Sequence, residues 1–238
     1  MDVPAGTECK PCEQGYYCKE GASVALPCKA GTYTTATNLT SADECTNTSV
    51  GHYAAAGSKE QTECSPGTIQ PKEGMGACDE CEAGKYQEKD GQTACDACLA
   101  GFYCGPGASA ALPCKAGTYS TLTNLTEDKC TPTERGFYAS TGTTKQVRCS
   151  PGTVAPNTSM GTCAKCEGGK YQPGEGLQEC LPCKEGYFCP EGANAPLPCK
   201  EGTYSTETDR DGDVRPCTKT SPGYNASPSR SPSRSPSP

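Results

Sequence analysis

The stretch CEAGKYQEKDGQTAC, which runs from Cys81 to Cys95, decides the fold of this chain. It is one copy of a small unit, here called a rung: a cysteine, two residues, a glycine, any residue, an aromatic residue, and a loop that returns to the next cysteine. The Gly-x-aromatic triplet recurs at steps of 16 to 20 residues, which gives twelve rungs, numbered here in chain order. The third residues of these triplets are Tyr17, Tyr33, Tyr53, Ile69, Tyr86, Tyr103, Tyr119, Tyr138, Val154, Tyr171, Phe188 and Tyr204.

A larger period is superimposed on the rungs, and all 21 cysteines follow it. The cysteines of one large repeat recur 86 or 85 residues later, and a third set begins 85 residues after the second. Self-similarity of this kind indicates a repeat architecture in which each unit contacts its neighbours. The three sets are Cys9, Cys12, Cys18, Cys28, Cys45, Cys64, Cys78 and Cys81; Cys95, Cys98, Cys104, Cys114, Cys130, Cys149, Cys163 and Cys166; and Cys180, Cys183, Cys189, Cys199 and Cys217.

These periods predict the domain organisation. Residues 1–9 resemble the tail of a preceding rung, 9–94 form the first large repeat, 95–179 the second and 180–219 a partial third. Residues 220–238 form a tail rich in serine, proline and arginine, a composition that favours extended polyproline II. Because Cys9 is the odd cysteine and its place in the pattern requires a partner upstream, we expect the chain to be a piece of a longer protein. The alternative is a free or intermolecular thiol.

The composition argues against a large hydrophobic core. Tryptophan is absent, phenylalanine occurs three times, and only 33% of the residues are hydrophobic even with the cysteines counted. Disulfides must therefore hold the fold, and dense disulfides indicate an oxidising, extracellular compartment. We expect a small, disulfide-rich, mostly irregular fold with short β-hairpins, arranged as an elongated ladder of tandem rungs. No apolar run of membrane-spanning length and no signal peptide is present in this segment.

Two pairing schemes fit the cysteine spacing, and sequence alone does not choose between them. In one scheme each rung closes on itself, as Cys64–Cys78 and Cys81–Cys95. We favour the other, interlocked scheme, because it would bind each rung covalently to the next. Its pairs are Cys12–Cys28, Cys18–Cys45, Cys64–Cys81, Cys78–Cys95, Cys98–Cys114, Cys104–Cys130, Cys149–Cys166, Cys163–Cys180, Cys183–Cys199 and Cys189–Cys217.

The third and eighth rungs lack an opening cysteine. Thr48 and Thr133 stand in its place, ahead of Gly51 and Gly136. These two rungs are also the longest, so we expect the ladder to bend there.

Asn-x-Ser/Thr sequons occur at Asn38, Asn47, Asn124, Asn157 and Asn225. In an oxidised, secreted protein such sites are candidate N-glycan acceptors on exposed loops. Asn38 and Asn124 occupy the same place in successive large repeats, although chance sequons are also expected in a threonine-rich chain.

Cys78-x-x-Cys81 and Cys95-x-x-Cys98 nearly match the spacing of a four-cysteine zinc site. The rung periodicity explains the same cysteines without a metal, so we predict no metal and no cofactor. The Asp209, Asp211 and Asp213 run resembles part of a calcium loop but lacks its closing glutamate, and an acidic surface turn is the better interpretation.

Catalysis and nucleic-acid binding are both disfavoured. His52 is the sole histidine and lies inside a Gly-x-aromatic triplet, where we expect it to pack like a neighbouring tyrosine. No nucleophile and base can be assembled around it, so we predict that the chain is not an enzyme. The net charge of −7 disfavours a nucleic-acid partner.

Residues 114–130 (CKAGTYSTLTNLTEDKC) and 149–163 (CSPGTVAPNTSMGTC) resemble the ephrin-receptor-like cysteine-rich repeat, a relative of the TNF-receptor and EGF-like modules. The resemblance extends over about residues 9–217. Joined to a Ser-Pro tail, such arrays are similar to extracellular glycoproteins of algae and protists, including mastigoneme-type flagellar fibres. That resemblance implies hydroxylated, glycosylated prolines in the tail at Pro228, Pro232, Pro236 and Pro238.

The function expected from these features is structural. We predict a glycosylated, rod-like segment of a surface fibre, mastigoneme or coat at the cell or flagellar surface, with itself and other surface glycoproteins as the expected partners. The alternative is the ligand-binding ectodomain of a cell-surface receptor of the TNF-receptor or ephrin-receptor type. The near-identical rungs favour the structural role, because a receptor should contain one divergent, apolar rung.

Overall fold

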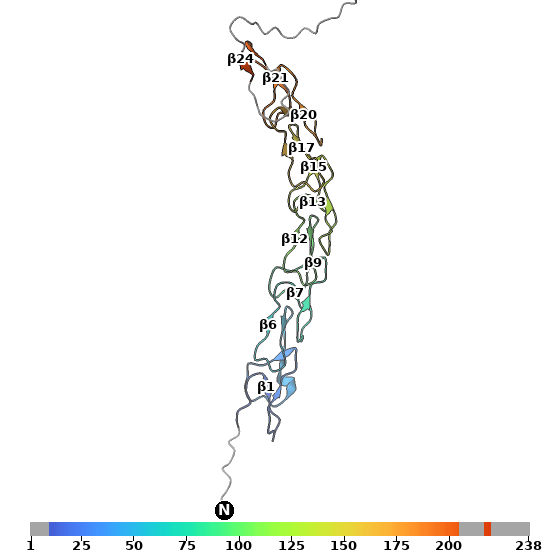
Figure 1. Cartoon of the computed structure of the whole chain (residues 1–238). Coiled ribbons are helices and arrows are strands. Elements are labelled where there is room, and N and C mark those ends of the chain that lie inside the picture. The colour runs from blue at the N-terminus through green and yellow to red at the C-terminus, as the bar shows by residue number, and fades with distance from the viewer. Residues whose placement is uncertain (1–9, 205–216, 220–238) are drawn as a thin grey trace, which may run out of the picture. The chain divides into compact units, whose positions relative to one another are not determined.

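The computed structural model of the chain describes residues 10–204 and 217–219. It divides into two compact units. The first comprises Met1–Pro113 and Leu122–Lys129, and the second comprises Cys114–Thr121 and Cys130–Pro238. Within each unit the hairpins follow one another in chain order (Figure 1).

Each rung forms one antiparallel hairpin of two two-residue strands, and the described residues contain twelve such sheets. The first strand of each hairpin ends at the third residue of the Gly-x-aromatic triplet, so the sequence period locates every hairpin. Helix is limited, in the described part, to the short 3-10 turn η1 (Ala42–Glu44). The hairpins are β1 (Tyr16–Tyr17) with β2 (Leu26–Pro27), β3 (Thr32–Tyr33) with β4 (Thr46–Asn47), β5 (His52–Tyr53) with β6 (Thr62–Glu63), β7 (Thr68–Ile69) with β8 (Asp79–Glu80), β9 (Lys85–Tyr86) with β10 (Asp96–Ala97), β11 (Phe102–Tyr103) with β12 (Leu112–Pro113), β13 (Thr118–Tyr119) with β14 (Thr131–Pro132), β15 (Phe137–Tyr138) with β16 (Val147–Arg148), β17 (Thr153–Val154) with β18 (Ala164–Lys165), β19 (Lys170–Tyr171) with β20 (Leu181–Pro182), β21 (Tyr187–Phe188) with β22 (Leu197–Pro198), and β23 (Thr203–Tyr204) with β24 (Thr218–Lys219).

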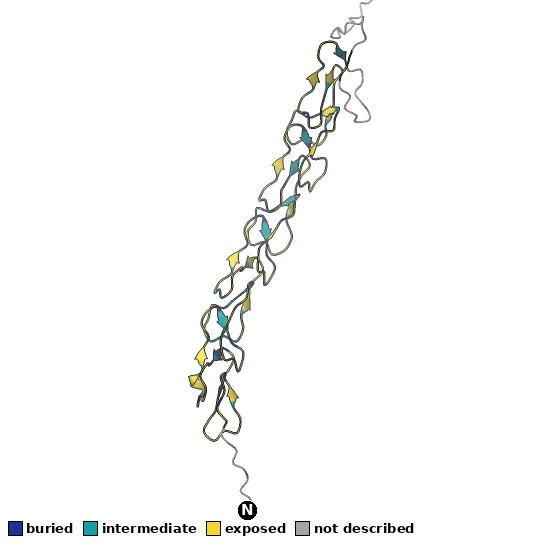
Figure 2. Ribbon diagram, turned by 90° about the vertical axis from the view of Figure 1, so that its left-hand side faces the viewer, coloured by how far each residue is buried: buried dark blue, intermediate teal, exposed yellow. Residues whose placement is uncertain are grey.

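The two strands of a hairpin differ in exposure. In rung 5, Tyr86 is half-buried and lies opposite Asp96, which is exposed. The same contrast recurs along the chain, with first strands mostly at intermediate exposure and second strands exposed (Figure 2). The aromatic residue, or Ile69 and Val154 in rungs 4 and 9, therefore supplies the small apolar surface of the rung, as β propensity predicts for a half-covered strand.

Cysteines dominate the buried interior. Half-cystines such as Cys28, Cys64, Cys98 and Cys149 have no exposed surface, whereas few large aliphatic side chains are buried. A small, disulfide-rich fold of short hairpins is thus confirmed.

The cysteine pairing differs from the interlocked scheme that we favoured from the sequence, and that scheme is wrong. Each disulfide lies within one rung: in seven rungs the hairpin returns the chain to its opening cysteine, and in rungs 1, 6 and 11 the opening cysteine is joined to a cysteine six residues later, directly after the first strand. In rung 5 the Cα atoms of Cys81 and Cys95 lie 5.8 Å apart. The ten disulfides are Cys12–Cys18, Cys28–Cys45, Cys64–Cys78, Cys81–Cys95, Cys98–Cys104, Cys114–Cys130, Cys149–Cys163, Cys166–Cys180, Cys183–Cys189 and Cys199–Cys217.

Backbone hydrogen bonds, rather than disulfides, join one rung to the next. The opening glycine of a rung donates its N–H to a carbonyl of the following rung, as Gly31 does to Ala54 at 2.8 Å and Gly136 to Ala155 at 2.9 Å. The loop of a rung also lies close to the opening glycine of the rung two places before it. A Cβ atom on Gly31, whose φ is +87°, would lie 2.0 Å from the carbonyl oxygen of Gly74, two rungs ahead. Glycine is required there both by the left-handed backbone and by the close approach.

Candidate functional site

One loop residue in each of rungs 2 to 11 fastens its loop to the preceding rung, and we call its place the latch position. Its N–H donates to the carbonyl oxygen of the residue that opens the preceding rung, at 2.7–3.1 Å. Its φ is positive in every case, between 57° and 79°. The latch residues are Asn38, Gly57, Gly74, Gly91, Gly107, Asn124, Gly142, Ser159, Gly176 and Gly192.

Three latch residues are not glycine, and all three belong to sequons. Asn38 and Asn124 are the acceptor residues of Asn-Leu-Thr, and Ser159 is the hydroxyl residue of the sequon that begins at Asn157. They are also the three non-glycine residues with positive φ in the described part of the chain. The sequons are evident in the sequence, but this backbone feature was not predicted from it; the available signal was the recurrence of glycine in the loops.

Asn38 exchanges two hydrogen bonds with Cys12. The Asn38 N–H donates to the Cys12 carbonyl at 2.9 Å, and the Asn38 side-chain oxygen Oδ1 accepts the Cys12 N–H at 3.0 Å. The next residue, Leu39, is buried, and its carbonyl accepts the N–H of Cys18 at 2.7 Å. The side chain of Asn38 itself is exposed.

The equivalent loop of rung 7 repeats the backbone part of this arrangement. The Asn124 N–H donates to the Cys98 carbonyl at 2.7 Å, and the Leu125 carbonyl accepts the N–H of Cys104 at 2.8 Å. Asn124 is exposed as well. The two loops therefore hold their asparagines at matching places, as the sequence period predicted.

The hydroxyl residue of the first sequon belongs to a capped turn. The Glu44 carboxylate accepts hydrogen bonds from the Thr40 hydroxyl at 2.8 Å and from the N–H groups of Thr40 and Ser41, both at 2.9 Å. These donors, the Thr40 hydroxyl foremost, lower the pKa of Glu44. Ser41 caps η1 in return, which forms a capping box.

The other predicted glycan sites fall into two groups. Asn47, at the end of β4, and Asn157, in the loop of rung 9, are both exposed. Asn225 and the tail prolines Pro228, Pro232, Pro236 and Pro238 lie outside the described residues, as do Cys9 and the aspartates at 209, 211 and 213.

Hydrogen bonds take the place of the disulfide in rungs 3 and 8. Thr48 and Thr133 are buried where a cysteine opens other rungs, and their hydroxyl oxygens accept the N–H groups of Met75 and Met160, each at 3.0 Å. In both rungs a glutamine stands at the place of the closing cysteine, Gln61 in rung 3 and Gln146 in rung 8. Gln61 Oε1 accepts the Ser49 N–H and Gln146 Oε1 accepts the Glu134 N–H, each at 2.8 Å.

Buried glutamines close the loops of rungs 4, 5 and 10. Each directly follows the aromatic position, and its Nε2 donates to the carbonyl of the residue before the closing cysteine. In rung 5, Gln87 donates to Ala94 at 2.8 Å, and its Oε1 accepts the Lys89 N–H at 3.0 Å. These residues were not predicted from the sequence, although alignment of the rungs with one another shows the glutamine. The members are Gln70, Gln87 and Gln172.

The zinc interpretation is incompatible with the pairing. Cys81 and Cys95 are joined to each other, while Cys78 is joined to Cys64 and Cys98 to Cys104. Within the described residues, no group of histidine, cysteine and carboxylate side chains is arranged to hold a metal ion.

His52 lies in β5, and its surroundings provide no nucleophile. Its side chain is 24% exposed, with Nδ1 3.0 Å from the Val50 carbonyl oxygen and Nε2 3.9 Å from a carboxylate oxygen of Glu63 on the partner strand. The histidine thus packs within its hairpin, as a tyrosine would.

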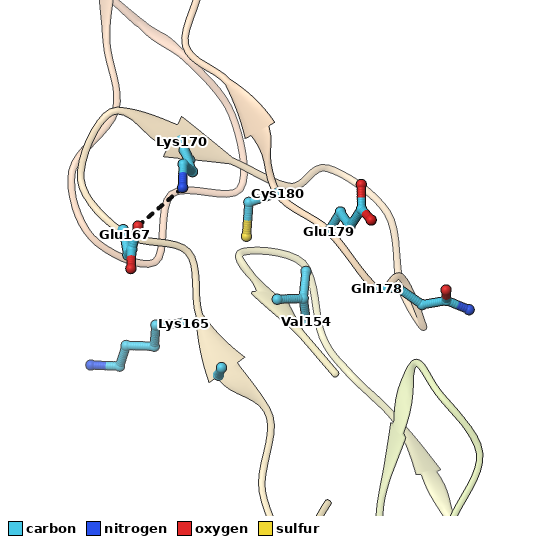
Figure 3. A pocket seen from close by; sticks show the side chains of 8 residues that line it. Val154, Lys165, Glu167, Lys170, Gln178, Glu179 and Cys180 are labelled. Carbon is cyan, nitrogen blue, oxygen red and sulfur yellow. Dashed lines mark hydrogen bonds and ion pairs between the residues drawn. The ribbon is translucent and has the colours of Figure 1, made fainter. Parts of the chain in front are cut away.

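A shallow pocket of about 400 Å³ lies in the second unit (Figure 3). Its lining mixes charges of both signs, with the Lys170 ammonium 3.0 Å from the Glu167 carboxylate. Val154 supplies an apolar wall, and the sulfur of Cys180 is bound in the disulfide with Cys166. The lining thus combines an ion pair with a disulfide sulfur.

In the residues that the structure describes, no helix is long enough and apolar enough to cross a bilayer.

Residues 73–111 match the family described as "Tyrosine-protein kinase ephrin type A/B receptor-like". The comparison with curated proteins returns no match. The matched segment contains all of rung 5, with β9, β10 and the Cys81–Cys95 disulfide. Together with the ten disulfides, this match supports a cysteine-rich, receptor-like repeat in an extracellular domain.

Proposed function

We propose that this chain is a structural segment of an extracellular glycoprotein, a subunit of a surface fibre, mastigoneme or coat. The observation that carries the proposal is one contact that recurs along the array, from the opening glycine of a rung to the latch residue two rungs ahead, in rungs 1 to 5 and 7 to 9. A Cβ atom on Gly31 would lie 2.0 Å from the Gly74 carbonyl oxygen, and the equivalent distance from Gly117 to Ser159 is 2.1 Å. A uniform series of contacts suits a load-bearing array, whereas recognition of one ligand requires a locally distinct surface.

Self-association is part of this proposal. Short hairpins leave strand edges and backbone groups available for pairing, and side chains such as Leu112 and Leu181 are about half exposed. Repeated units that present the same groups at regular intervals favour ordered association along the array. Other surface glycoproteins of similar construction would be suitable partners.

The alternative is the ligand-binding ectodomain of a cell-surface receptor, which the match of residues 73–111 supports equally. Such a chain should remain monodisperse and bind a soluble protein through a few adjacent rungs. The two functions therefore make opposite predictions about the isolated, secreted chain.

The deciding experiment is to secrete the full chain from a eukaryotic host and to follow its mass by light scattering over a range of concentrations, with electron microscopy of the same samples. Reversible growth into filaments or sheets is the expected result. A single species of monomer mass at every concentration, with no ordered assemblies in the images, would contradict the structural proposal and favour the receptor.

A further inference from the structure

The latch position does not require a side chain. Seven of the ten latch residues are glycine, and every one of the ten makes the same backbone hydrogen bond. Rungs 4 and 9 occupy the same place in successive large repeats, yet the latch is Gly74 in one and Ser159 in the other. A positive φ is strained for any residue with a Cβ, least so for asparagine. The non-glycine latches are thus departures from the residue that fits the backbone best.

Backbone strain that the fold does not require points to a function of the side chain. The side chains retained at the latch position all belong to sequons. Two of them, Asn38 and Asn124, are the residues whose amide nitrogen would carry a sugar. Rungs 2 and 7, where they lie, are equivalent rungs of two large repeats.

The hydrogen bonds of Asn38 define which end of its amide group is free. The Cys12 N–H requires an acceptor, so the end that faces it is Oδ1, 3.0 Å away. The other end is Nδ2, which makes no hydrogen bond to any described residue, and the side chain is exposed. A substituent on Nδ2 would therefore leave both hydrogen bonds between Asn38 and Cys12 in place.

We propose that the latch positions of rungs 2 and 7 are built N-glycan acceptor sites, in which one asparagine both fastens its loop to the preceding rung and carries the sugar. The inference deepens the proposed function and depends on the chain being secreted. The donor is an oligosaccharide attached to a lipid through pyrophosphate. A bond forms between Nδ2 and C1 of the first sugar, the bond between C1 and the pyrophosphate oxygen breaks, the lipid pyrophosphate leaves, and Nδ2 loses a proton.

Because Asn38 is held to Cys12 through its backbone and its side chain, the sugar has a fixed starting point beside the junction of rungs 1 and 2. Its counterpart at Asn124 starts beside the junction of rungs 6 and 7, where Cys98 opens the preceding rung. Glycans would thus be attached once per large repeat at the same structural position, not at random loop sites.

The test uses the full chain secreted from a eukaryotic host, with glycan occupancy measured at each sequon by mass spectrometry after enzymatic release in ¹⁸O water. We expect Asn38 and Asn124 to be modified, and Asn38→Asp and Asn124→Asp each to remove the mass of one glycan. Aspartate keeps the Oδ1 acceptor and stands at the equivalent sequence position, Asp209, in the third repeat. Secreted protein in which both asparagines are unmodified overturns the proposal.

A second pair of variants tests the double role of Asn38. Thr40→Ala removes the sequon and keeps the asparagine, whereas Asn38→Ala removes the sequon together with the Oδ1 acceptor. We expect hydrogen exchange at the Cys12 amide to stay slow in Thr40→Ala and in Asn38→Asp and to accelerate at least tenfold in Asn38→Ala. Equal exchange in Asn38→Ala and Thr40→Ala would overturn the fastening role. Filament formation is scored separately, so loss of glycans and failure of the fibre proposal are distinct results.

Discussion

The hydroxyl oxygen of Thr48 accepts the backbone N–H of Met75 at 3.0 Å, in a rung that has no disulfide. Thr48 is fully buried, and the same relationship joins Thr133 to Met160 one large repeat later. Each of these rungs is also closed by a glutamine, Gln61 or Gln146, at the place of a cysteine. In each large repeat of five rungs, one rung is thus closed by hydrogen bonds and the other four contain a disulfide.

Thr48→Val should weaken the junction between rungs 3 and 4. Valine matches the shape of threonine but leaves the Met75 N–H without its acceptor, a loss of about 1–3 kcal/mol for a buried donor. Hydrogen exchange at Met75 should accelerate accordingly, while exchange at Met160 should be unchanged. Thr48→Ser, which retains the hydroxyl, is the matched control. Unchanged protection of Met75 in Thr48→Val would show that the hydrogen bond is energetically unimportant.

The double substitution Thr48→Cys with Gln61→Cys should create an additional disulfide. These positions correspond to the opening and closing cysteines of rung 4, whose Cα atoms are 5.8 Å apart in Cys64–Cys78. A non-reducing peptide map should show residues 48 and 61 joined, and chemical denaturation should show a gain of about 3 kcal/mol for a loop of this size. Thr48→Cys alone should present a titratable thiol. If the double variant instead shows two free thiols, the correspondence between rungs 3 and 4 fails.

Digestion at glutamate residues distinguishes the two pairing schemes directly. Without reduction, closure of each rung on itself should leave residues 64–73 (CSPGTIQPKE) joined to residues 74–80 (GMGACDE). The interlocked scheme would instead join residues 64–73 to the dipeptide of residues 81–82. Cleavage after Glu80 is accessible because β8 is exposed. Recovery of residues 64–73 joined to residues 81–82 would contradict the disulfide pairing of the structure.

A series of three glycine-to-alanine variants separates backbone strain from close contact. Gly105 has neither a positive φ nor a neighbour within 4 Å of a new Cβ, so Gly105→Ala should be neutral. Gly21 has a φ of +72° with open space around it, so Gly21→Ala should lose about 1–2 kcal/mol from strain alone. Gly31→Ala adds a contact of 2.0 Å with the Gly74 carbonyl oxygen and should be the most destabilising. Thermal unfolding without reductant should reproduce this order; equal effects of the last two would argue against the packing of loops two rungs apart.

The capped turn at η1 should be sensitive to acid. The pKa of Glu44 is lowered by the Thr40 hydroxyl and by the N–H groups of Thr40 and Ser41. A carboxyl with a lower pKa in the folded state contributes stability that is complete above the ordinary glutamate pKa of about 4.3 and is lost as the pH falls through the lowered value. NMR titration of protein made without glycans should find the Glu44 pKa low in the wild type and returned toward the ordinary value in Thr40→Val. Thr37→Val, at a nearby exposed threonine, should leave it unchanged.

The sequence predicted the hairpins well because a glycine marks every first strand and is followed two positions later by an aromatic residue, or by Ile69 and Val154 in rungs 4 and 9. The disulfide pairing could not be derived in the same way. The spacing of Cys64, Cys78 and Cys81 gives only the number of residues between the sulfurs, and both pairing schemes are compatible with that number. The pairing is decided by the hairpin, whose second strand brings Cys78 back beside Cys64. That return depends on the register of the two strands. The latch position was hidden for a related reason, since a left-handed residue such as Asn38 is recognised by its φ and not by its side chain.

Closure of each rung on itself has a mechanical consequence. When the ends of such a chain are pulled, the force passes through a sulfur–sulfur bond such as Cys81–Cys95 and bypasses the loop between the two cysteines. Between Cys45 and Cys64, and again between Cys130 and Cys149, there is no such shortcut, and the backbone itself bears the load. Tension would therefore unravel rungs 3 and 8, whose closure depends on Thr48, Gln61, Thr133 and Gln146, before it extends the rungs closed by long disulfide loops. These two rungs act as extensible links of set length, longer than the stretches from Cys18 to Cys28, Cys104 to Cys114 and Cys189 to Cys199, which the short disulfides of rungs 1, 6 and 11 also leave unbridged.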